Sequence, residues 1–278
     1  MSTGSKTLIV DNIRTHYLEA GTGRPLVLLH SGEFGASAEL SWGASIDALA
    51  EHYRVIAPDW LGFGGTDKVY DFVNGRPRRL QHMARFLKAM DLGPAAFIGS
   101  SMGGSELIRS VAEGKGTFDV SVMVLSSSGG FSPDNEARRI ILNYDATREG
   151  MRTLISTLFH DPKWAADEDY VTKKYEVSIV PGAWESLAAA RFRSPAVEVR
   201  SHFGQEDNTV YENITVPTLL VAGAEDPLRE RGYAALMHDR IPDSTLRVYD
   251  DAGHFPHIEQ PARFNEDVLA FLNERYPS

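Results

Sequence analysis

Short runs of apolar residues recur along the chain and alternate with longer amphipathic segments. The run 25–30 is almost entirely apolar, which is typical of a strand that is buried on both faces of a parallel sheet. Segments 80–92 and 264–272 instead space their apolar residues three and four apart, and this period predicts helices. Further strands are predicted at 53–57, 95–99, 121–125, 217–222 and 245–249.

The order of these elements predicts an α/β fold, with a mostly parallel sheet that is flanked by helices. Two alternating runs near the N-terminus, at 8–10 and 15–18, predict an opening hairpin that turns at Asp11 and Asn12. The hairpin therefore precedes the regular alternation of strands and helices.

The alternation breaks once, between about 132 and 212, where the pattern is helical and rich in aromatic and charged residues. We therefore predict that residues 1–131 and 213–278 form two parts of one core, and that residues 132–212 form a helical cap. Open α/β sheets bind their ligands at the carboxyl ends of the strands. The cap is expected to roof a pocket at that edge.

Composition and charge narrow the classes of partner. The chain has 278 residues, of which 42% are hydrophobic and 24% are charged, as in ordinary soluble globular proteins. Its formal net charge of -10 disfavours nucleic acid, a polyanion, as a partner. The basic clusters at 76–79 and 138–139 are short, and we interpret them as solvated faces of helices.

The chain contains no cysteine, which excludes disulfides, thiolate metal ligands and a cysteine nucleophile. No apolar run approaches the roughly 20 residues needed to cross a bilayer, and the segment 7–10 is too short for the core of a signal peptide. These features lead us to expect a cytoplasmic protein without a membrane partner.

The strongest chemical signal is the G-x-S-x-G pattern at 99–103, the pattern of a nucleophile elbow. It lies where a predicted strand ends and a helix is expected to begin. A sharp turn from strand to helix strains the serine backbone and brings neighbouring chain so close that only glycine fits on either side. Ser101 is therefore the predicted nucleophile.

A serine hydroxyl is a weak nucleophile until a base takes its proton. Folds with this elbow supply an acid and then a histidine later in the chain. Asp226 and His254 follow the last two predicted strands, in that order, so both should lie at the same sheet edge as Ser101. We predict a catalytic triad of Ser101, Asp226 and His254.

Each partner has a rival nearby in the sequence. Glu225 is the alternative acid and His257 is the alternative base. The glycine at 253 favours His254, because this loop must bend the imidazole back toward the sheet. His30, at the end of an early strand, is interpreted as a structural residue rather than as a second base.

Acyl transfer also needs two backbone donors for the developing oxyanion. The amides of Met102, directly after the nucleophile, and of Gly32, in the loop 30–35, are the predicted donors. No phosphate-binding or dinucleotide-binding glycine pattern follows that loop, and the histidines lack the spacing of H-E-x-x-H. We therefore expect neither a cofactor nor a metal.

Taken together, these motifs resemble those of the α/β-hydrolase superfamily across nearly the whole chain. Within it, the chain is most similar to the meta-cleavage-product hydrolases, serine enzymes that hydrolyse a C–C bond in vinylogous 1,5-diketone acids from aromatic degradation. The segments that carry this narrower resemblance are 101–104, 174–186 and 253–265.

The resemblance also implies four residues that bind substrate. Ser100 stands where that family usually has asparagine, and Phe255 stands where it usually has tryptophan. The cap arginine that grips the substrate carboxylate falls on Lys174, which keeps the charge but loses the bidentate geometry. Arg191 is a nearby alternative for that role, as is Arg193.

The resemblance thus implies a serine hydrolase that cleaves the C–C bond of a 2-hydroxy-6-oxo-dienoate. A carboxylesterase or lactonase acting on a small ester is the alternative enzyme. A receptor that binds a ligand on the same fold without turnover is the alternative from another class. The expected partner is a small-molecule substrate, and because relatives often self-associate, a homo-oligomer is compatible with the sequence.

Overall fold

The computed structural model of the chain describes residues 3–114, 116–189 and 203–278. Its centre is an eight-stranded sheet with the order β1-β2-β4-β3-β5-β6-β7-β8. The first three strands in that order pair antiparallel, and every later pair is parallel. The strands are β1 (Gly4–Val10), β2 (Ile13–Ala20), β3 (Pro25–Leu29), β4 (Arg54–Pro58), β5 (Ala95–Ser100), β6 (Val120–Ser126), β7 (Thr218–Gly223) and β8 (Ser244–Tyr249).

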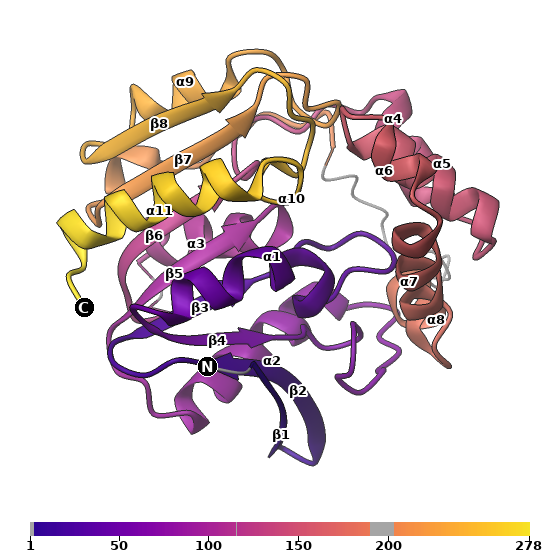
Figure 1. Cartoon of the computed structure of the whole chain (residues 1–278), viewed down its shortest axis with the longest axis horizontal. Coiled ribbons are helices and arrows are strands. Elements are labelled where there is room, and N and C mark those ends of the chain that lie inside the picture. The colour runs from indigo at the N-terminus through magenta and orange to yellow at the C-terminus, as the bar shows by residue number, and fades with distance from the viewer. Residues whose placement is uncertain (1–2, 115, 190–202) are drawn as a thin grey trace.

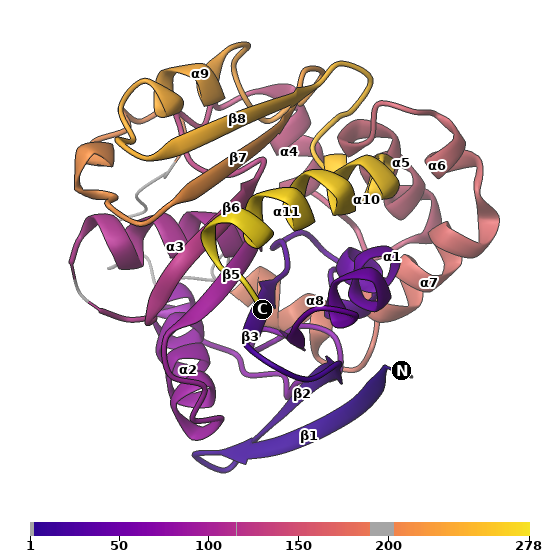
Figure 2. The same ribbon diagram turned by 60° about the vertical axis from the view of Figure 1, so that its left-hand side comes forward.

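Helices cover both faces of this sheet (Figures 1 and 2), so the predicted α/β fold is confirmed. On one face lie α1 (Ala38–Ala50) and α11 (Pro261–Arg275). On the other lie α2 (Gly75–Ala89), α3 (Met102–Ala112) and α9 (Tyr233–His238). The sequence pattern had predicted α2 and α11, and both are longer than the predicted periodic segments.

Between β6 and β7 the chain leaves the sheet and forms a group of helices on one side of it, drawn in red tones in Figure 1. The arrowheads of β7 and β8 point toward that side, so the group lies beyond the carboxyl ends of the strands. Its helices are α4 (Glu136–Leu142), α5 (Arg148–Leu158), α6 (Lys163–Ala166), α7 (Glu168–Ser178) and α8 (Ala183–Ala188). Two short helices follow later, a 3-10 turn at Tyr211–Asn213 and α10 (Pro256–Glu259).

The continuous apolar runs of the central strands have a simple cause. Successive side chains of a strand point to opposite faces, and here both faces are covered. Leu26 and Leu28 of β3 belong to the cluster under α1 and α11, whereas Val27 and Leu29 belong to the cluster under α2, α3 and α9. A central strand such as β3 must therefore be apolar along its whole length.

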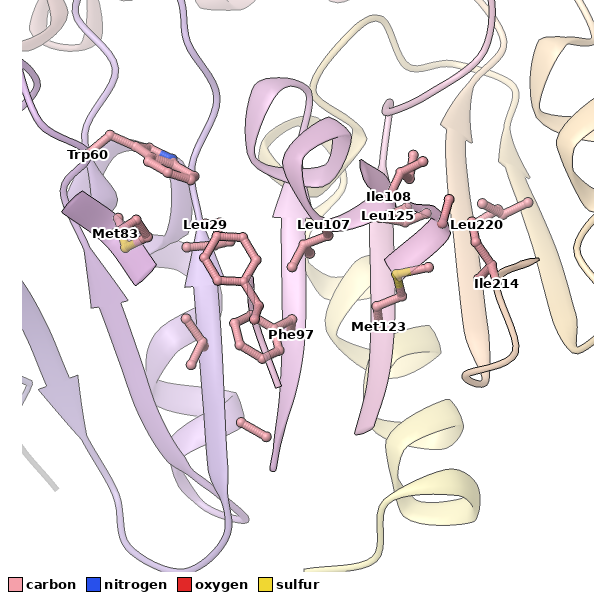
Figure 3. Close-up of a cluster of buried hydrophobic side chains, with 14 of the residues drawn as sticks. Leu29, Trp60, Met83, Phe97, Leu107, Ile108, Met123, Leu125, Ile214 and Leu220 are labelled. Carbon is pink, nitrogen blue, oxygen red and sulfur yellow. The ribbon is translucent and has the colours of Figure 1, made fainter. Parts of the chain in front are cut away.

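Figure 3 shows the second of these clusters. Leu29, Phe97, Leu125 and Leu220 come from four neighbouring strands and share one face of the sheet. Met83, Leu107 and other helix side chains pack onto them. This shared core and the strand pairing hold the ends of β3, β5, β6 and β7 in place relative to one another.

A third apolar cluster joins the helices between β6 and β7 to the loops at the carboxyl edge of the sheet. Helix α5 contributes Met151, Leu154, Ile155 and Leu158, at the spacing of a buried helix face, and the side chain of Thr147 caps its N-terminus. The same cluster contains Phe34, Leu228 and Phe255, which lie in the loops after β3, β7 and β8. The helices between β6 and β7 thus share a core with the loops that surround Ser101.

We predict that Phe97→Ala lowers the free energy of unfolding by about 3–5 kcal/mol, because a ring of 2% exposure leaves a cavity in the cluster of Figure 3. Chemical denaturation measures this quantity. The control is Ile9→Ala on the edge strand β1, where the side chain is 61% exposed and the expected loss is below about 1 kcal/mol. Equal losses for both variants would contradict this account of the core.

Candidate active site

The turn from β5 into α3 takes place at one residue. Ser101 has φ 50° and ψ -107°, outside the regions that most side chains occupy, and α3 begins at the next residue. A Cβ on Gly99 would lie 2.5 Å from Cα of Gly104, and one on Gly103 would collide with the carbonyl of Leu29. Glycine is required at both places because the neighbouring backbones touch.

Three side chains from separate loops form a hydrogen-bonded chain at this turn. Nε2 of His254 lies 2.8 Å from Oγ of Ser101, and Nδ1 of His254 lies 2.8 Å from Oδ2 of Asp226. The other carboxylate oxygen of Asp226 accepts the amide of Leu228 at 2.8 Å. The structure therefore brings together the three residues that the sequence singled out.

The electrostatic environment of Asp226 favours the ionised form of its carboxyl, which is the form that its hydrogen bond with His254 requires. Burial alone would raise the pKa of its carboxyl, but the adjacent His254, the charge of Arg229 and the Leu228 amide together hold that pKa below its ordinary value. Asp226 is thus a carboxylate at neutral pH, and it favours the tautomer of His254 that carries its proton on Nδ1. That tautomer leaves Nε2 free to accept the proton of Ser101.

The loop that carries His254 is held from two sides. The amide of His254 donates to the carbonyl of Leu158 at the end of α5, at 2.8 Å. The amide of Gly253 donates to Glu259 at 2.7 Å, and Glu259 also accepts the amide of His160 at 2.9 Å. A Cβ at 253 would lie 2.5 Å from the Leu158 carbonyl, so glycine is needed before the histidine.

The rival residues lie elsewhere. Glu225 forms an exposed ion pair with Arg231 at 2.9 Å. Nδ1 of His257 lies 3.1 Å from Oγ of Ser126, and burial lowers the pKa of His257 to about 3, so its ring is neutral. His30 is bound by backbone: the amide of Trp60 donates to its Nε2.

Ser101 and His254 line a cavity of about 310 Å³. Its walls come both from the sheet edge and from the helices between β6 and β7. Among the lining residues are Gly32, Glu33, Met102, Arg138, Ile141, Leu142, Leu158, Phe203, Leu228, Arg229 and Phe255. A cavity of this size accepts a small organic molecule.

The two predicted oxyanion donors lie side by side. Met102 is the first residue of α3, where the amides have no partner within the helix and the helix dipole favours negative charge. A Cβ on Gly32 would lie 2.7 Å from the sulfur of Met102, so the loop after β3 passes directly over the start of α3. Both residues line the cavity.

The four predicted substrate-binding residues are placed differently from one another. Phe255 is buried and lines the cavity. Ser100 is fully buried at the end of β5 and is not among the residues that line the cavity. Lys174 is only 1% exposed, and its ammonium lies 2.6 Å from the carboxylate of Glu33. Arg191 lies outside the described residues, as does Arg193.

The interpretation of the basic clusters as solvated helix faces is wrong for Arg79 and Arg138, and it holds only in part for Arg76, which lies at the rim of the cavity. Arg76 and Arg138 line the cavity, and Nε of Arg79 is buried with the guanidinium over the ring of Phe63. Only the neighbours Arg78 and Arg139 are exposed in the expected way. A short basic cluster on a helix has two faces, and sequence alone did not show which face meets the pocket.

Glu33 and Arg229 are site residues that the sequence reasoning missed. Glu33 lies in the loop that was expected to supply an oxyanion donor, and Arg229 lies three residues after Asp226. A charged residue beside each predicted catalytic loop was the available signal. Within the described ranges, no group of three or more His, Asp or Glu side chains could hold a metal ion. No helix in those ranges is long and apolar enough to cross a membrane.

Comparison with known proteins gives consistent results. Residues 26–267 match the Alpha/beta hydrolase family. The chain is 36% identical over 267 residues to a 2-hydroxy-6-oxo-6-(2'-aminophenyl)hexa-2,4-dienoic acid hydrolase of Metapseudomonas resinovorans, covering 95% of this chain and 89% of that protein. It is 30% identical to a 2-hydroxymuconate semialdehyde hydrolase of Pseudomonas sp. (strain CF600), covering 97% of this chain and 94% of that one.

Solved structures give the same picture. A serine hydrolase involved in carbazole degradation superposes with a TM-score of 0.83 at 30% identity, covering 99% of this chain and 100% of the other. A meta-cleavage product hydrolase from Pseudomonas fluorescens IP01 superposes with a TM-score of 0.82 at 29% identity, covering 98% of each chain.

We predict that Glu33→Gln lowers the free energy of unfolding by about 3–5 kcal/mol, because it leaves the buried ammonium of Lys174 without a counter-charge. Denaturation of the variant measures the loss. Glu225→Gln, which breaks an exposed pair, is the matched control and should cost less than about 1 kcal/mol.

The double variant Glu33→Gln with Lys174→Met should recover most of that stability, because it removes both buried charges.

The pH dependence of the stability that this ion pair contributes has a definite sign. Burial would raise the pKa of Glu33, yet Lys174 holds it below its ordinary value. The stabilisation is therefore present above the unfolded pKa of about 4.3 and is lost as the pH falls through the folded value. A Glu33→Gln variant as stable as the wild type would contradict the importance of this pair.

Proposed function

This chain belongs to the alpha/beta hydrolase family, and from that premise we propose that it hydrolyses the C–C bond of a 2-hydroxy-6-oxo-dienoate with Ser101 as its nucleophile. The observation that carries the proposal is the unbroken chain from Ser101 through His254 to Asp226 inside a small-molecule cavity. Relatives named as hydrolases of such dienoates support the substrate class. The proposed products are a carboxylic acid and a 2-hydroxydienoate.

The bond-breaking part of the reaction begins with attack by the serine. Nε2 of His254 accepts the proton of the Ser101 hydroxyl as the oxygen attacks the carbonyl at C6, and Asp226 stabilises the imidazolium that forms. The amides of Met102 and Gly32 receive the oxyanion, each contributing about 3 kcal/mol to the lowering of the barrier. The tetrahedral carbon then expels C5 and leaves an acyl group on Ser101.

Expulsion of a carbon requires a stabilised carbanion. Resemblance to the C–C hydrolases adds a preceding ketonisation, in which the dienol gains a proton at C5 and its 2-hydroxyl becomes a ketone. The electron pair of the broken C5–C6 bond is then delocalised into that ketone as a dienolate. The imidazolium of His254 gives its proton to the dienolate oxygen, and the 2-hydroxydienoate leaves. Neutral His254 then deprotonates water, which attacks the acyl group, and the proton passes to Oγ of Ser101 as the carboxylic acid is released.

We propose that residues 132–212 act as the cap of this site and residues 1–131 and 213–278 as its core. Arg138, Ile141, Leu142, Leu158 and Phe203 line the cavity from the cap side, which supports a role in substrate selection. Catalysis without a cofactor or metal, location in the cytoplasm and self-association as a homo-oligomer stay predictions.

We predict that Ser101→Ala lowers turnover by about 10⁴-fold or more, because no other hydroxyl is bonded to the imidazole of His254 among the described residues. The assay follows the bleaching of the yellow dienolate form of a ring-fission dienoate. Thermal unfolding should be close to that of the wild type, since the change removes one oxygen. Turnover near the wild-type rate in Ser101→Ala would exclude the serine mechanism.

We predict that Asp226→Asn lowers turnover by about 10³- to 10⁴-fold, because an amide no longer favours the required tautomer of His254. Glu225→Gln, the adjacent acid on the surface, is the matched control and should keep the wild-type rate. A substrate panel with dienoates, nitrophenyl esters and lactones separates the reactions. Rapid turnover of esters with no bleaching of dienoates would refute C–C hydrolysis and leave the triad in place.

A further inference from the structure

The cavity around Ser101 is cationic in a protein of net charge -10. Among the residues that the structure describes, four arginines line it, Arg76, Arg109, Arg138 and Arg229, against the two carboxylates of Glu33 and Glu106. A concentration of positive charge inside a concave, partly dry site raises the local concentration of anions. Which of these charges is available to a ligand depends on what each one already binds.

Two of the arginines share one carboxylate at the rim. Nε of Arg76 lies 2.6 Å from Oε1 of Glu106, and a terminal nitrogen of Arg109 lies 3.6 Å from the same oxygen. Both arginine side chains are more than a third exposed, so water also solvates them. This cluster is therefore largely compensated before any ligand arrives.

Lys174, the residue that the resemblance assigns to the substrate carboxylate, is compensated as well. Its ammonium and the carboxylate of Glu33 are both buried and lie 2.6 Å apart. A second carboxylate brought to this ammonium would face Glu33 at close range, in surroundings where like charges repel strongly. The buried pair is therefore an unfavourable place for an acidic substrate group.

Arg138 and Arg229 are different, because their hydrogen bonds within the described residues go to neutral oxygens. Arg138 donates to the carbonyls of Pro133 and Leu228, each at 3.2 Å, and its guanidinium lies over the ring of Phe203. Arg229 donates to Oγ of Ser132 at 2.8 Å and to the carbonyl of Ser127 at 3.3 Å. In the described residues, no carboxylate lies within 4 Å of either group.

Both arginines also keep unused donors. A guanidinium has five N–H donors. One terminal nitrogen of Arg138 makes no hydrogen bond within the described part of the chain, and Nε of Arg229 is buried without a partner there. Asp226 and Asp134 attract Arg138 from a distance, but Asp226 is bonded to His254 and Asp134 is ion-paired with Arg139.

The two guanidinium groups act on each other. Burial and the nearby charge of Arg229 lower the pKa of Arg138 to about 10, so it is still a cation at neutral pH. Two like charges that share a cavity are costly unless an anion lies between or beside them. A carboxylate would relieve this repulsion and could accept from both side chains.

We propose that Arg138 and Arg229 form the site that binds the carboxylate of the substrate, in place of Lys174. The proposal rests on the proposed function, which requires an acidic substrate. It assigns recognition of the substrate carboxylate to α4 and to the loop after β7, both of which line one cavity. Apolar lining residues such as Leu142 and Leu228 would then contact the hydrocarbon part.

A purely structural role is the competing explanation, because Arg138 ties α4 to the loop after β7, and Arg229 ties that loop to the segment between β6 and α4. The two explanations differ in their dependence on ligand charge. An anion site distinguishes a carboxylate from its neutral isostere, whereas a structural tie affects both alike. Benzoate and benzamide are a suitable pair of probes, since they have nearly the same shape and need no turnover.

The experiment titrates benzoate and benzamide separately into the wild-type protein and the Arg138→Gln variant by calorimetry at low ionic strength. We expect the wild type to bind benzoate more tightly than benzamide, and Arg138→Gln to bind benzoate about tenfold more weakly with little change for benzamide. Arg138→Lys, which restores the charge, should recover part of the benzoate affinity. Arg229→Gln should weaken benzoate in the same selective way.

The matched control is Arg139→Gln, the next residue on α4, which is exposed and ion-paired with Asp134. It should leave both affinities unchanged. No preference for benzoate in the wild type, or equal losses for benzoate and benzamide in Arg138→Gln, would overturn the proposal. If Lys174→Met is instead the variant that selectively loses affinity for benzoate, the proposal is also overturned, and the role returns to Lys174.

The same titrations separate this proposal from the proposed function. Selective loss of benzoate binding in a protein that never bleaches dienoates would support the carboxylate site and reject C–C hydrolysis. If instead Arg138→Gln and Arg229→Gln both bleach dienoates with an unchanged KM, C–C hydrolysis is supported and the carboxylate site is rejected. For a dienoate substrate, we expect Arg138→Gln to raise KM about tenfold and to change kcat much less, because the acid group is bound in ground state and transition state alike.

Discussion

The active site depends on the tight packing of β5, α3 and β3 at the turn where β5 ends and α3 begins. One residue, Ser101, makes the turn with a positive φ, and this is possible only because Gly99 and Gly103 allow the neighbouring backbones to touch. The same contact places the start of α3 under the loop that contains Gly32. The turn at one serine therefore presents its hydroxyl at the cavity, beside the residues that we predict to donate to the oxyanion.

Features that are written in contiguous sequence could be predicted. The strands were evident because a strand between two layers of helices is apolar at every position, as in Leu26 to Leu29. The elbow was evident because its glycines are fixed by local geometry. Asp226 and His254 could be placed because the carboxyl ends of parallel strands meet at one edge, so order along the chain determines position in space.

Features that depend on pairing across the fold could not be predicted. Glu33 and Lys174 are 141 positions apart, and nothing local in either segment indicates that their charges meet in a buried pair. Arg138 and Arg139 are adjacent and chemically identical, yet one lines the cavity and the other is exposed. Helical rotation decides between them, and it is set by how α4 packs on the loop after β7.

The helices between β6 and β7 are hydrogen-bonded to the loop that carries His254, the proposed base, which bears on how substrate choice and chemistry are related. The amide of His254 is bonded to the last turn of α5, and Glu259 binds both the amide before His254 and the amides that follow α5. A displacement of α5 would therefore move the imidazole as well as the cavity wall at Leu158. Because the proposed base must keep hydrogen-bond distance to Ser101, the proposed reaction restricts the position of these helices. Differences in substrate specificity should accordingly come from side chains such as Arg138 rather than from the positions of the helices.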